Sequence, residues 1–85
     1  MTKKEKIDDI FNILIQYEKI KEENSGIDVN IYQNYLDRLS VWYTGYGNEE
    51  IACGIRGLYY LGDSASHETV KRMVFHIIDI LDKEE

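Results

Sequence analysis

Apolar residues recur at intervals of three and four residues in four stretches of the chain, which is the spacing of helices that bury one face. These stretches predict helices over residues 3–24, 29–44, 49–61 and 66–83. None of them alternates apolar and polar residues with the period of two that a half-buried strand requires. Because short connections join the amphipathic helices, the sequence predicts an all-α fold, a small four-helix bundle in a single domain over residues 1–85.

Residues at the predicted helix boundaries agree with these limits. A side chain able to accept a hydrogen bond from the first turn precedes each helix: Thr2, Asp28, Asn48 and Ser66. Gly26 and Gly62 are expected to end the first and third helices. Gly54 and Gly57 lie inside the third helix, where each costs about 1 kcal/mol relative to alanine. Glycines at such positions predict close packing of another helix against the bare backbone.

Apolar residues cover most of the circumference of the first predicted helix, because Ile13, Ile15 and Ile20 flank its main stripe. One neighbouring helix cannot cover so wide an arc, and exposed apolar patches are usually contact sites. We therefore expect a homodimer with the first and second helices nearest the seam, the alternative being that two other helices of the chain cover the first. The predicted core consists of Ile10, Phe11, Leu14, Leu39, Ile51, Ile55, Leu58, Val74, Ile77 and Leu81.

The charge of the chain narrows the classes of partner. Sixteen acidic residues against ten basic ones give a net charge of −6. Such a charge repels nucleic acid and anionic membranes, and it favours basic partners or simply solubility. No apolar stretch reaches the roughly 18 residues needed to span a bilayer, and the charged residues 3–6 are unlike a secretory signal. We therefore expect a cytoplasmic protein that contacts neither membrane nor nucleic acid.

Few residues suit catalysis or metal binding. His67 and His76 lie nine residues apart on opposite sides of one predicted helix, so they cannot share a metal ion and are expected at the surface or boundary. Cys53 is the only cysteine, which excludes an internal disulfide, and a small buried thiol is its expected role. No glycine-rich phosphate loop or nucleophile elbow occurs. We expect a protein that is not an enzyme and that holds no metal or other cofactor.

An aromatic group near the end of the second predicted helix is the candidate for partner binding. Trp42 continues the apolar stripe of that helix, so core packing explains it best. Tyr43 and Tyr46 lie at the helix end, where a bundle is usually exposed. Tyrosine and tryptophan dominate the hot spots of protein interfaces. The sequence therefore leaves two interpretations of these three residues, contact with a protein partner and packing in the core.

The leading hypothesis is a small acidic interaction protein that inhibits or adapts a larger protein, including a nucleic-acid-binding one. Its size, charge and lack of catalytic groups are similar to those of phage-borne inhibitors such as anti-CRISPRs, and to those of bacteriocin immunity proteins. This is a similarity of format rather than of motif.

Short pieces of the sequence resemble a LuxR-type helix-turn-helix: Asn48-Glu49-Glu50-Ile51-Ala52, Ser66, Thr69-Val70-Lys71 and the run from Ile77 to Leu81. The resemblance implies a transcription regulator whose recognition helix starts near Ser66 and places His67, Glu68, Lys71 and Arg72 nearest the DNA. The stretch between Ala52 and Ser66 is longer than in that family by about two helical turns. Residues 48–85 also carry eight acids against four bases, the wrong sign for a phosphate-binding face. A DNA-binding regulator is the alternative function.

Overall fold

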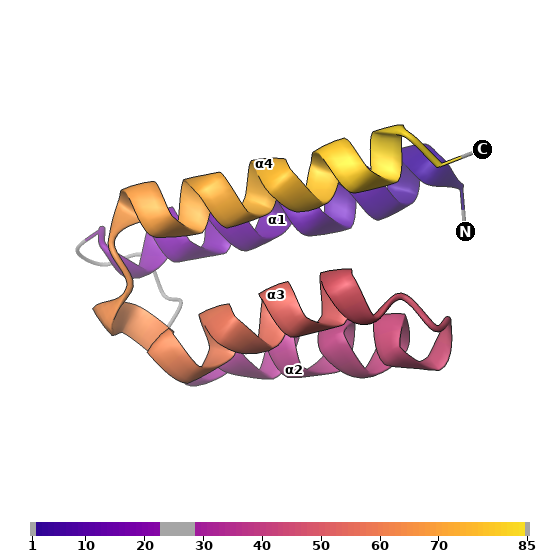
Figure 1. Ribbon diagram of the computed structural model, residues 1–85. Coiled ribbons are helices and arrows are strands. Elements are labelled where there is room, and N and C mark those ends of the chain that lie inside the picture. Colours follow the sequence, from indigo (N-terminus) through magenta and orange to yellow (C-terminus); the bar gives the residue numbers. More distant parts are fainter. Residues whose placement is uncertain (1, 23–28, 85) are drawn as a thin grey trace.

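The computed structural model describes residues 2–22 and 29–84, and these residues form four α-helices (Figure 1). Helix α1 spans Lys3–Ile20, α2 spans Val29–Gly45, α3 spans Glu49–Leu61 and α4 spans His67–Asp82. A short 3-10 helix, η1, follows α3 over Gly62–Ser64 and was not predicted. No strand occurs in the described part of the chain, so the predicted all-α four-helix bundle is confirmed. The first helix ends at Ile20 with Lys21 as its C-cap, so it is shorter than the predicted range 3–24, while Gly26 and Asp28 lie outside the described residues.

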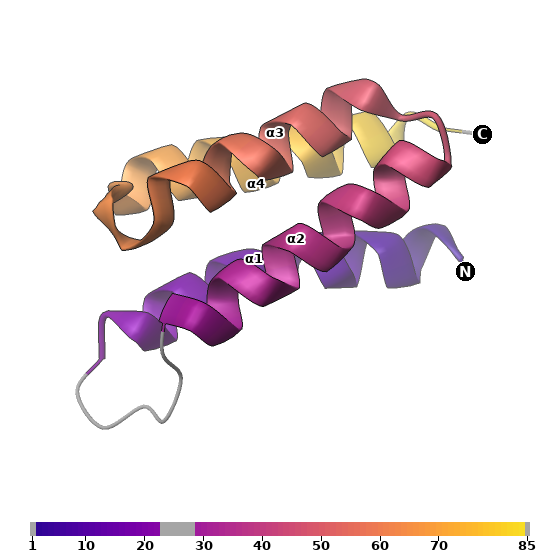
Figure 2. The same ribbon diagram turned by 90° about the horizontal axis from the view of Figure 1, so that it is seen from below.

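The four helices form two layers, α1 beside α4 and α2 beside α3 (Figure 1). Each helix runs in the opposite direction to the one before it, so the N- and C-terminal ends lie at the same end of the bundle. Figure 2 shows the bundle from the side of α2 and α3. Contacts within each layer are extensive, whereas α1 with α2 and α3 with α4 touch at fewer positions. The line where α1 meets α2 therefore leaves room for a hollow at the surface.

Three predicted helix starts are confirmed by side-chain hydrogen bonds. The Thr2 hydroxyl accepts from the Glu5 backbone N–H at 3.1 Å, and the Glu5 carboxylate accepts from the Thr2 backbone N–H at 3.4 Å, which is a capping box. The Asn48 carbonyl oxygen Oδ1 accepts from the Ile51 N–H at 3.4 Å. Ser66 caps α4 in the same way. These caps satisfy backbone donors that no residue of the helix itself could reach.

A side chain of α2 caps the C-terminal end of α3. Gly62 has a φ of 56° and donates its N–H to the Leu58 carbonyl, as expected for a glycine that ends a helix. The Gln33 side-chain amide of α2 donates to the Tyr59 carbonyl at 3.0 Å. A side chain of the neighbouring helix thus satisfies a carbonyl that the last turn of α3 leaves unpaired.

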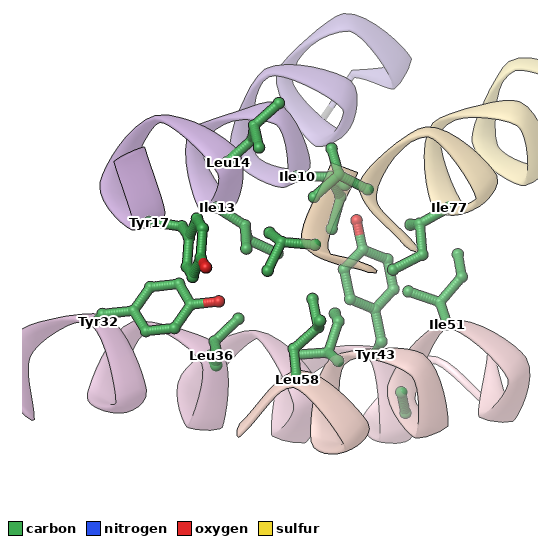
Figure 3. Close-up of a cluster of buried hydrophobic side chains, with 14 of the residues drawn as sticks. Ile10, Ile13, Leu14, Tyr17, Tyr32, Leu36, Tyr43, Ile51, Leu58 and Ile77 are labelled. Carbon is green, nitrogen blue, oxygen red and sulfur yellow. The ribbon is translucent and has the colours of Figure 1, made fainter. Parts of the chain in front are cut away.

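The core lies between the two layers and combines aliphatic side chains with three tyrosines (Figure 3). Eight of the ten predicted core residues are buried, and two are not: Phe11 is exposed and Leu39 is half-buried. Helix α1 faces both α4 and α2, so its buried arc is centred on Ile10, Ile13 and Tyr17 rather than on Phe11. The buried side chains are those of Ile10, Ile13, Leu14, Tyr17, Tyr32, Leu36, Tyr43, Ile51, Ala52, Ile55, Leu58, Ala65, Val70, Val74, Ile77 and Leu81.

Only one of the two glycines inside α3 meets a neighbouring helix. A Cβ at position 54 would lie 2.7 Å from the Met73 sulfur and 3.5 Å from the Ile77 Cδ1, so Gly54 allows α4 to approach closely. The prediction of close packing is therefore confirmed for Gly54. It is wrong for Gly57, where a Cβ would meet nothing within 4 Å because this residue lies on the outer side of α3.

Replacing Gly57 with alanine should stabilise the protein by roughly 0.5–1 kcal/mol, because the substitution removes the helix-propensity cost and meets no neighbour. The matched replacement Gly54→Ala should gain clearly less or destabilise, since Met73 must first move away. Urea unfolding followed by circular dichroism measures both variants. An equal increase in stability for both variants would show that the close approach of α4 does not require a glycine at position 54.

Truncating Leu14 or Ile77 to alanine should lower the free energy of unfolding by about 2–5 kcal/mol, because each side chain is buried in the core. Val41→Ala is the matched control, since Val41 is 65% exposed and its truncation should change stability by about 0.5 kcal/mol or less. Chemical denaturation compares the three variants. A loss below about 1 kcal/mol at both core positions would contradict this packing.

Candidate partner-binding site

Helix α2 is unusually poor in charge for a helix with one face in solvent. Its 17 residues include only two charged ones, Asp37 and Arg38. The whole chain has 26 charged residues among 85, the sum of 10 basic and 16 acidic ones. Depletion of charge, together with enrichment in aromatic residues and arginine, is the composition of the core of a protein interface. The composition of α2 therefore resembles that of an interface core.

The three aromatic residues predicted for partner binding lie in one cluster. The Trp42 and Tyr46 rings have centroids 4.2 Å apart at an interplanar angle of 38°, and Trp42 meets Tyr43 edge-on at 4.9 Å. Tyr46 is 68% exposed, Trp42 is half-buried and Tyr43 is buried. Tyr43 therefore packs in the core, contrary to its expected exposure at the helix end, because it lies on the inner side of α2. Trp42 and Tyr46 remain at the surface and lie one against the other.

A hollow of about 260 Å³ opens beside Trp42 where α1 meets α2. The Tyr35 hydroxyl donates to the Asp9 backbone carbonyl at 2.7 Å and so closes part of its wall. The ammonium group of Lys6 lies 5.9 Å from the centroid of the Tyr46 ring and 3.7 Å from the Glu84 carboxylate. The hollow is lined by Asp9, Tyr35, Arg38, Leu39, Trp42 and Tyr43.

Two further hollows border the same helix. One of about 550 Å³ lies between α2 and α3, where the Arg56 guanidinium donates to the Thr44 hydroxyl at 2.7 Å. Its walls include Val41, which is 65% exposed, and Tyr60, which is 81% exposed. The other is shallower and is lined by Ile31, Asn34, Asp37 and Arg38. All three hollows thus follow α2. We use the name α2 surface for the outward residues Tyr35, Arg38, Val41 and Trp42 of this helix together with Tyr46, which directly follows it.

Sequence reasoning named Trp42 and Tyr46 but missed Tyr35, Arg38 and Val41, as well as Tyr60 of α3. One signal was present in the sequence, because the second predicted helix carries only two charged residues. A periodic pattern alone does not reveal which polar or apolar residues beside the stripe stay exposed. That depends on where α1 and α3 cover the flanks of α2.

Burial controls the ionisation of Tyr43 and Tyr35. Burial raises the pKa of Tyr43 from 10.0 to about 12, and the negative charges of Asp9 and Glu84 act in the same direction. The pKa of Tyr35 is also raised, again mainly by burial. A neutral tyrosine is thus part of the folded state, since the anion would lose its hydration on entering the core.

The raised pKa predicts a loss of stability in alkali. Below about pH 10 Tyr43 is neutral in both states, and between pH 10 and 12 only the unfolded chain ionises, so stability falls by roughly 2–3 kcal/mol on account of Tyr43. Unfolding by urea at a series of pH values, with tyrosinate absorbance as a second readout, measures this fall. In Tyr43→Phe the fall over the same pH range should be smaller, and an unchanged slope would contradict the assignment.

The candidate metal and thiol residues lie apart from one another. His67 contacts Glu18 and His76 contacts Glu50, each at 3.3 Å, and both histidines are at the surface as expected. Within residues 2–22 and 29–84, no group of three side chains suited to holding a metal ion occurs. Cys53 is exposed, so the expectation of a buried thiol is wrong. Its neighbour Ala52 takes the buried position, since the inner arc of α3 passes through Ala52 and Ile55.

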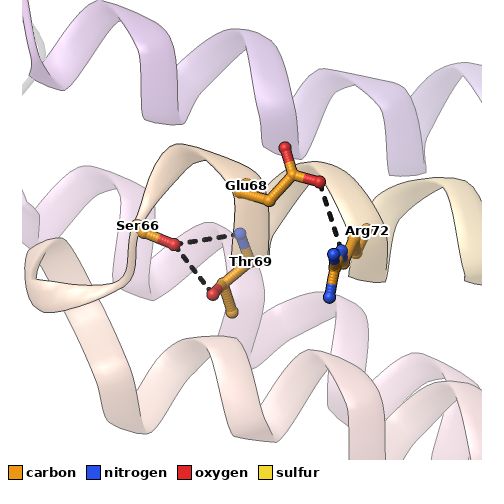
Figure 4. Close-up of polar contacts among 4 residues, drawn as sticks. All are labelled: Ser66, Glu68, Thr69 and Arg72. Atoms are coloured by element: carbon orange, nitrogen blue, oxygen red, sulfur yellow. Dashed lines mark hydrogen bonds and ion pairs between the residues drawn. The ribbon is translucent and has the colours of Figure 1, made fainter.

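The residues proposed for DNA contact lie on the outer side of α4. The Ser66 hydroxyl accepts from the Thr69 N–H at 3.1 Å, and Arg72 donates to Glu68 at 3.2 Å (Figure 4). His67, Lys71 and Arg72 are exposed, as the resemblance implies. In a helix-turn-helix the two helices meet at about 90–120°, whereas α3 and α4 run alongside each other in opposite directions. DNA binding stays a prediction, and this arrangement does not favour it.

No family model matches the chain, and no curated protein or solved structure matches it significantly. Among the described helices, none is both long and apolar enough to cross a membrane. Function has to be inferred from the surface chemistry of the molecule.

Proposed function

We propose that the protein is a non-enzymatic interaction module of the cytoplasm that inhibits or adapts a larger protein. The α2 surface is the proposed contact. The observation that carries the proposal is a surface formed by the half-buried Trp42 and the exposed Arg38 of a helix almost without charge, with the exposed Tyr46 directly after that helix. These three residue types dominate the energetics of protein interfaces.

The geometry of the aromatic pair suits a contact surface. The Trp42 and Tyr46 rings already pack against each other, with centroids 4.2 Å apart, before any partner arrives. Ordering of side chains upon binding costs about 0.5–1.5 kcal/mol for each mobile side chain. A pair that holds its arrangement in the free protein avoids part of that cost. The hollow beside Trp42 offers space for one anchoring side chain of the partner.

Charge suggests the chemistry of that partner. The whole chain carries a net charge of −6, but the hollows along α2 are bordered by two acids, Asp9 and Asp37, and two arginines, Arg38 and Arg56. The acidic residues that give the chain its net negative charge therefore lie outside the α2 surface. Such an arrangement attracts a basic protein over a distance while aromatic contacts supply the close fit. A protein with a basic surface, such as one that binds nucleic acid, fits best.

The test is capture of partners from a lysate of the source cells with the immobilised chain and its variants. Val41→Asp and Tyr46→Ala alter exposed residues of the α2 surface, so they should fold normally. Leu61→Asp is the matched control, since Leu61 is exposed at the end of α3 outside the α2 surface. A partner that uses the α2 surface should be retained by the wild type and by Leu61→Asp, and lost from both α2 variants.

With the purified partner, Tyr46→Ala should weaken binding by roughly tenfold or more, as expected for a truncated hot spot. Added salt should slow association and leave dissociation nearly unchanged. Proteins retained equally by all variants would contradict the α2 surface as the contact. A steep, log-linear loss of affinity for DNA with salt would instead support the transcription-regulator alternative.

A further inference from the structure

A second exposed apolar patch lies on the opposite layer, where α1 meets α4. Phe11 is 40% exposed, Ile15 is 39% exposed and Phe75 is 46% exposed. The Phe11 and Phe75 rings contact each other across the two helices, with centroids 6.4 Å apart. The core does not need these side chains, because α1 is already buried through Ile10 and Ile13. We call Phe11, Ile15 and Phe75 the α1/α4 patch.

Along each of the two helices, a basic residue precedes the aromatic residue of the patch and an acidic residue follows it. On α4, Lys71 and Asp79 lie four residues before and four residues after Phe75. On α1, Lys4 and Glu18 lie seven residues before and seven residues after Phe11. Offsets of four and seven keep these residues on the same side of a helix as the aromatic residue. All four charged residues are exposed, and both carboxylates also have a partner within the chain, since Lys83 lies 3.0 Å from Asp79 and His67 lies 3.3 Å from Glu18.

This pattern is complementary to itself. Consider a two-fold axis that passes beside Phe75 and places α4 antiparallel to α4 of a second copy. Lys71 of each copy then lies opposite Asp79 of the other, so two such pairs form. Each pair lies about 6 Å along the helix from Phe75. The same operation brings Lys4 opposite Glu18 along α1. The like-charged residues Glu68 and Asp82 also come opposite each other, and the Arg72 guanidinium, 3.2 Å from Glu68, offsets part of that repulsion.

We propose that the α1/α4 patch is the seam of a homodimer in which a second copy of this chain packs face to face, with corresponding helices antiparallel. The exposed aromatic rings of the two copies cover each other, and the two Lys71–Asp79 pairs set the direction. The seam lies on α1 and α4, not on α1 and α2 as the apolar pattern of the sequence suggests. The α2 surface belongs to the other layer and stays open on both copies.

The area and the apolar content of the face formed by α1 and α4 indicate how tightly the dimer should associate. The molecule measures 40 × 22 × 19 Å, so one long side can supply the roughly 800 Å² that each partner buries in an interface of standard size. Only three large apolar side chains are exposed there, which is few for an obligate dimer. We therefore expect dissociation in the micromolar range rather than a permanent dimer.

Sedimentation velocity over a range of protein concentrations tests this seam. The wild type should shift from 10.0 kDa toward twice that mass as concentration rises. Phe75→Glu should remain monomeric, because it buries two carboxylates at the centre of the seam. Val41→Glu is the matched control on the α2 surface and should dimerise like the wild type. A monomer at all concentrations, or a dimer that survives Phe75→Glu, would overturn the proposal.

A charge exchange tests the antiparallel direction. In Lys71→Asp alone the two pairs become Asp with Asp, and in Asp79→Lys alone they become Lys with Lys, so each variant should dimerise roughly tenfold more weakly. An equimolar mixture of the two should dimerise as well as the wild type, because each mixed dimer restores both opposite-charge pairs. Circular dichroism checks that both variants fold. A mixture no stronger than the separate variants would refute the proposed pairing.

Discussion

The packing of α1 against α4 in its own layer and against α2 in the other layer is the contact on which the rest of the bundle depends. Helix α1 lies beside α4, yet its buried side chains Ile13 and Tyr17 also face Tyr32 and Leu36 of the other layer (Figure 3). The Tyr17 hydroxyl donates to the Ala65 carbonyl, which ties α1 to the connection before α4. A chain of this length buries only about 60% of its unfolded surface. The single cysteine allows no internal disulfide, so the stability has to come from the packing of the helices.

The same packing decides which residues remain for function. Since α1 turns Ile10 and Ile13 inward, Phe11 and Ile15 are left on the outer side beside Phe75. Since α1 touches α2 at few positions, a hollow stays open beside Trp42. The two proposed contact surfaces therefore follow from one arrangement of helices and lie on different layers. A dimer through one layer would present two copies of the α2 surface, which raises the apparent affinity for any partner that offers two sites.

Tyrosine has two distinct roles in this protein. Tyr17, Tyr32 and Tyr43 are core side chains. Burial raises the pKa of Tyr32 and of Tyr43, so the neutral forms of these two residues belong to the folded state. Tyr46, in the turn after α2, and Tyr60, on the outer side of α3, are exposed. Residue type alone therefore does not separate a core tyrosine from a contact tyrosine. The neighbours that cover each ring make that distinction.

The amino-acid sequence by itself determined the class of fold, the number of described α-helices and the starts of α1, α3 and α4, because helical periodicity and N-caps act through residues three or four apart. It also indicated Trp42 and Tyr46 as candidates for partner contact. Only the tertiary structure decided that Ile13 replaces Phe11 in the core, that Gly54 but not Gly57 meets another helix, and that Cys53 is exposed. The physical reason is that a wide apolar arc can bury several alternative faces. The choice among them is made by the volumes of side chains distant in sequence, such as Tyr32 against Tyr17 and Met73 against Gly54.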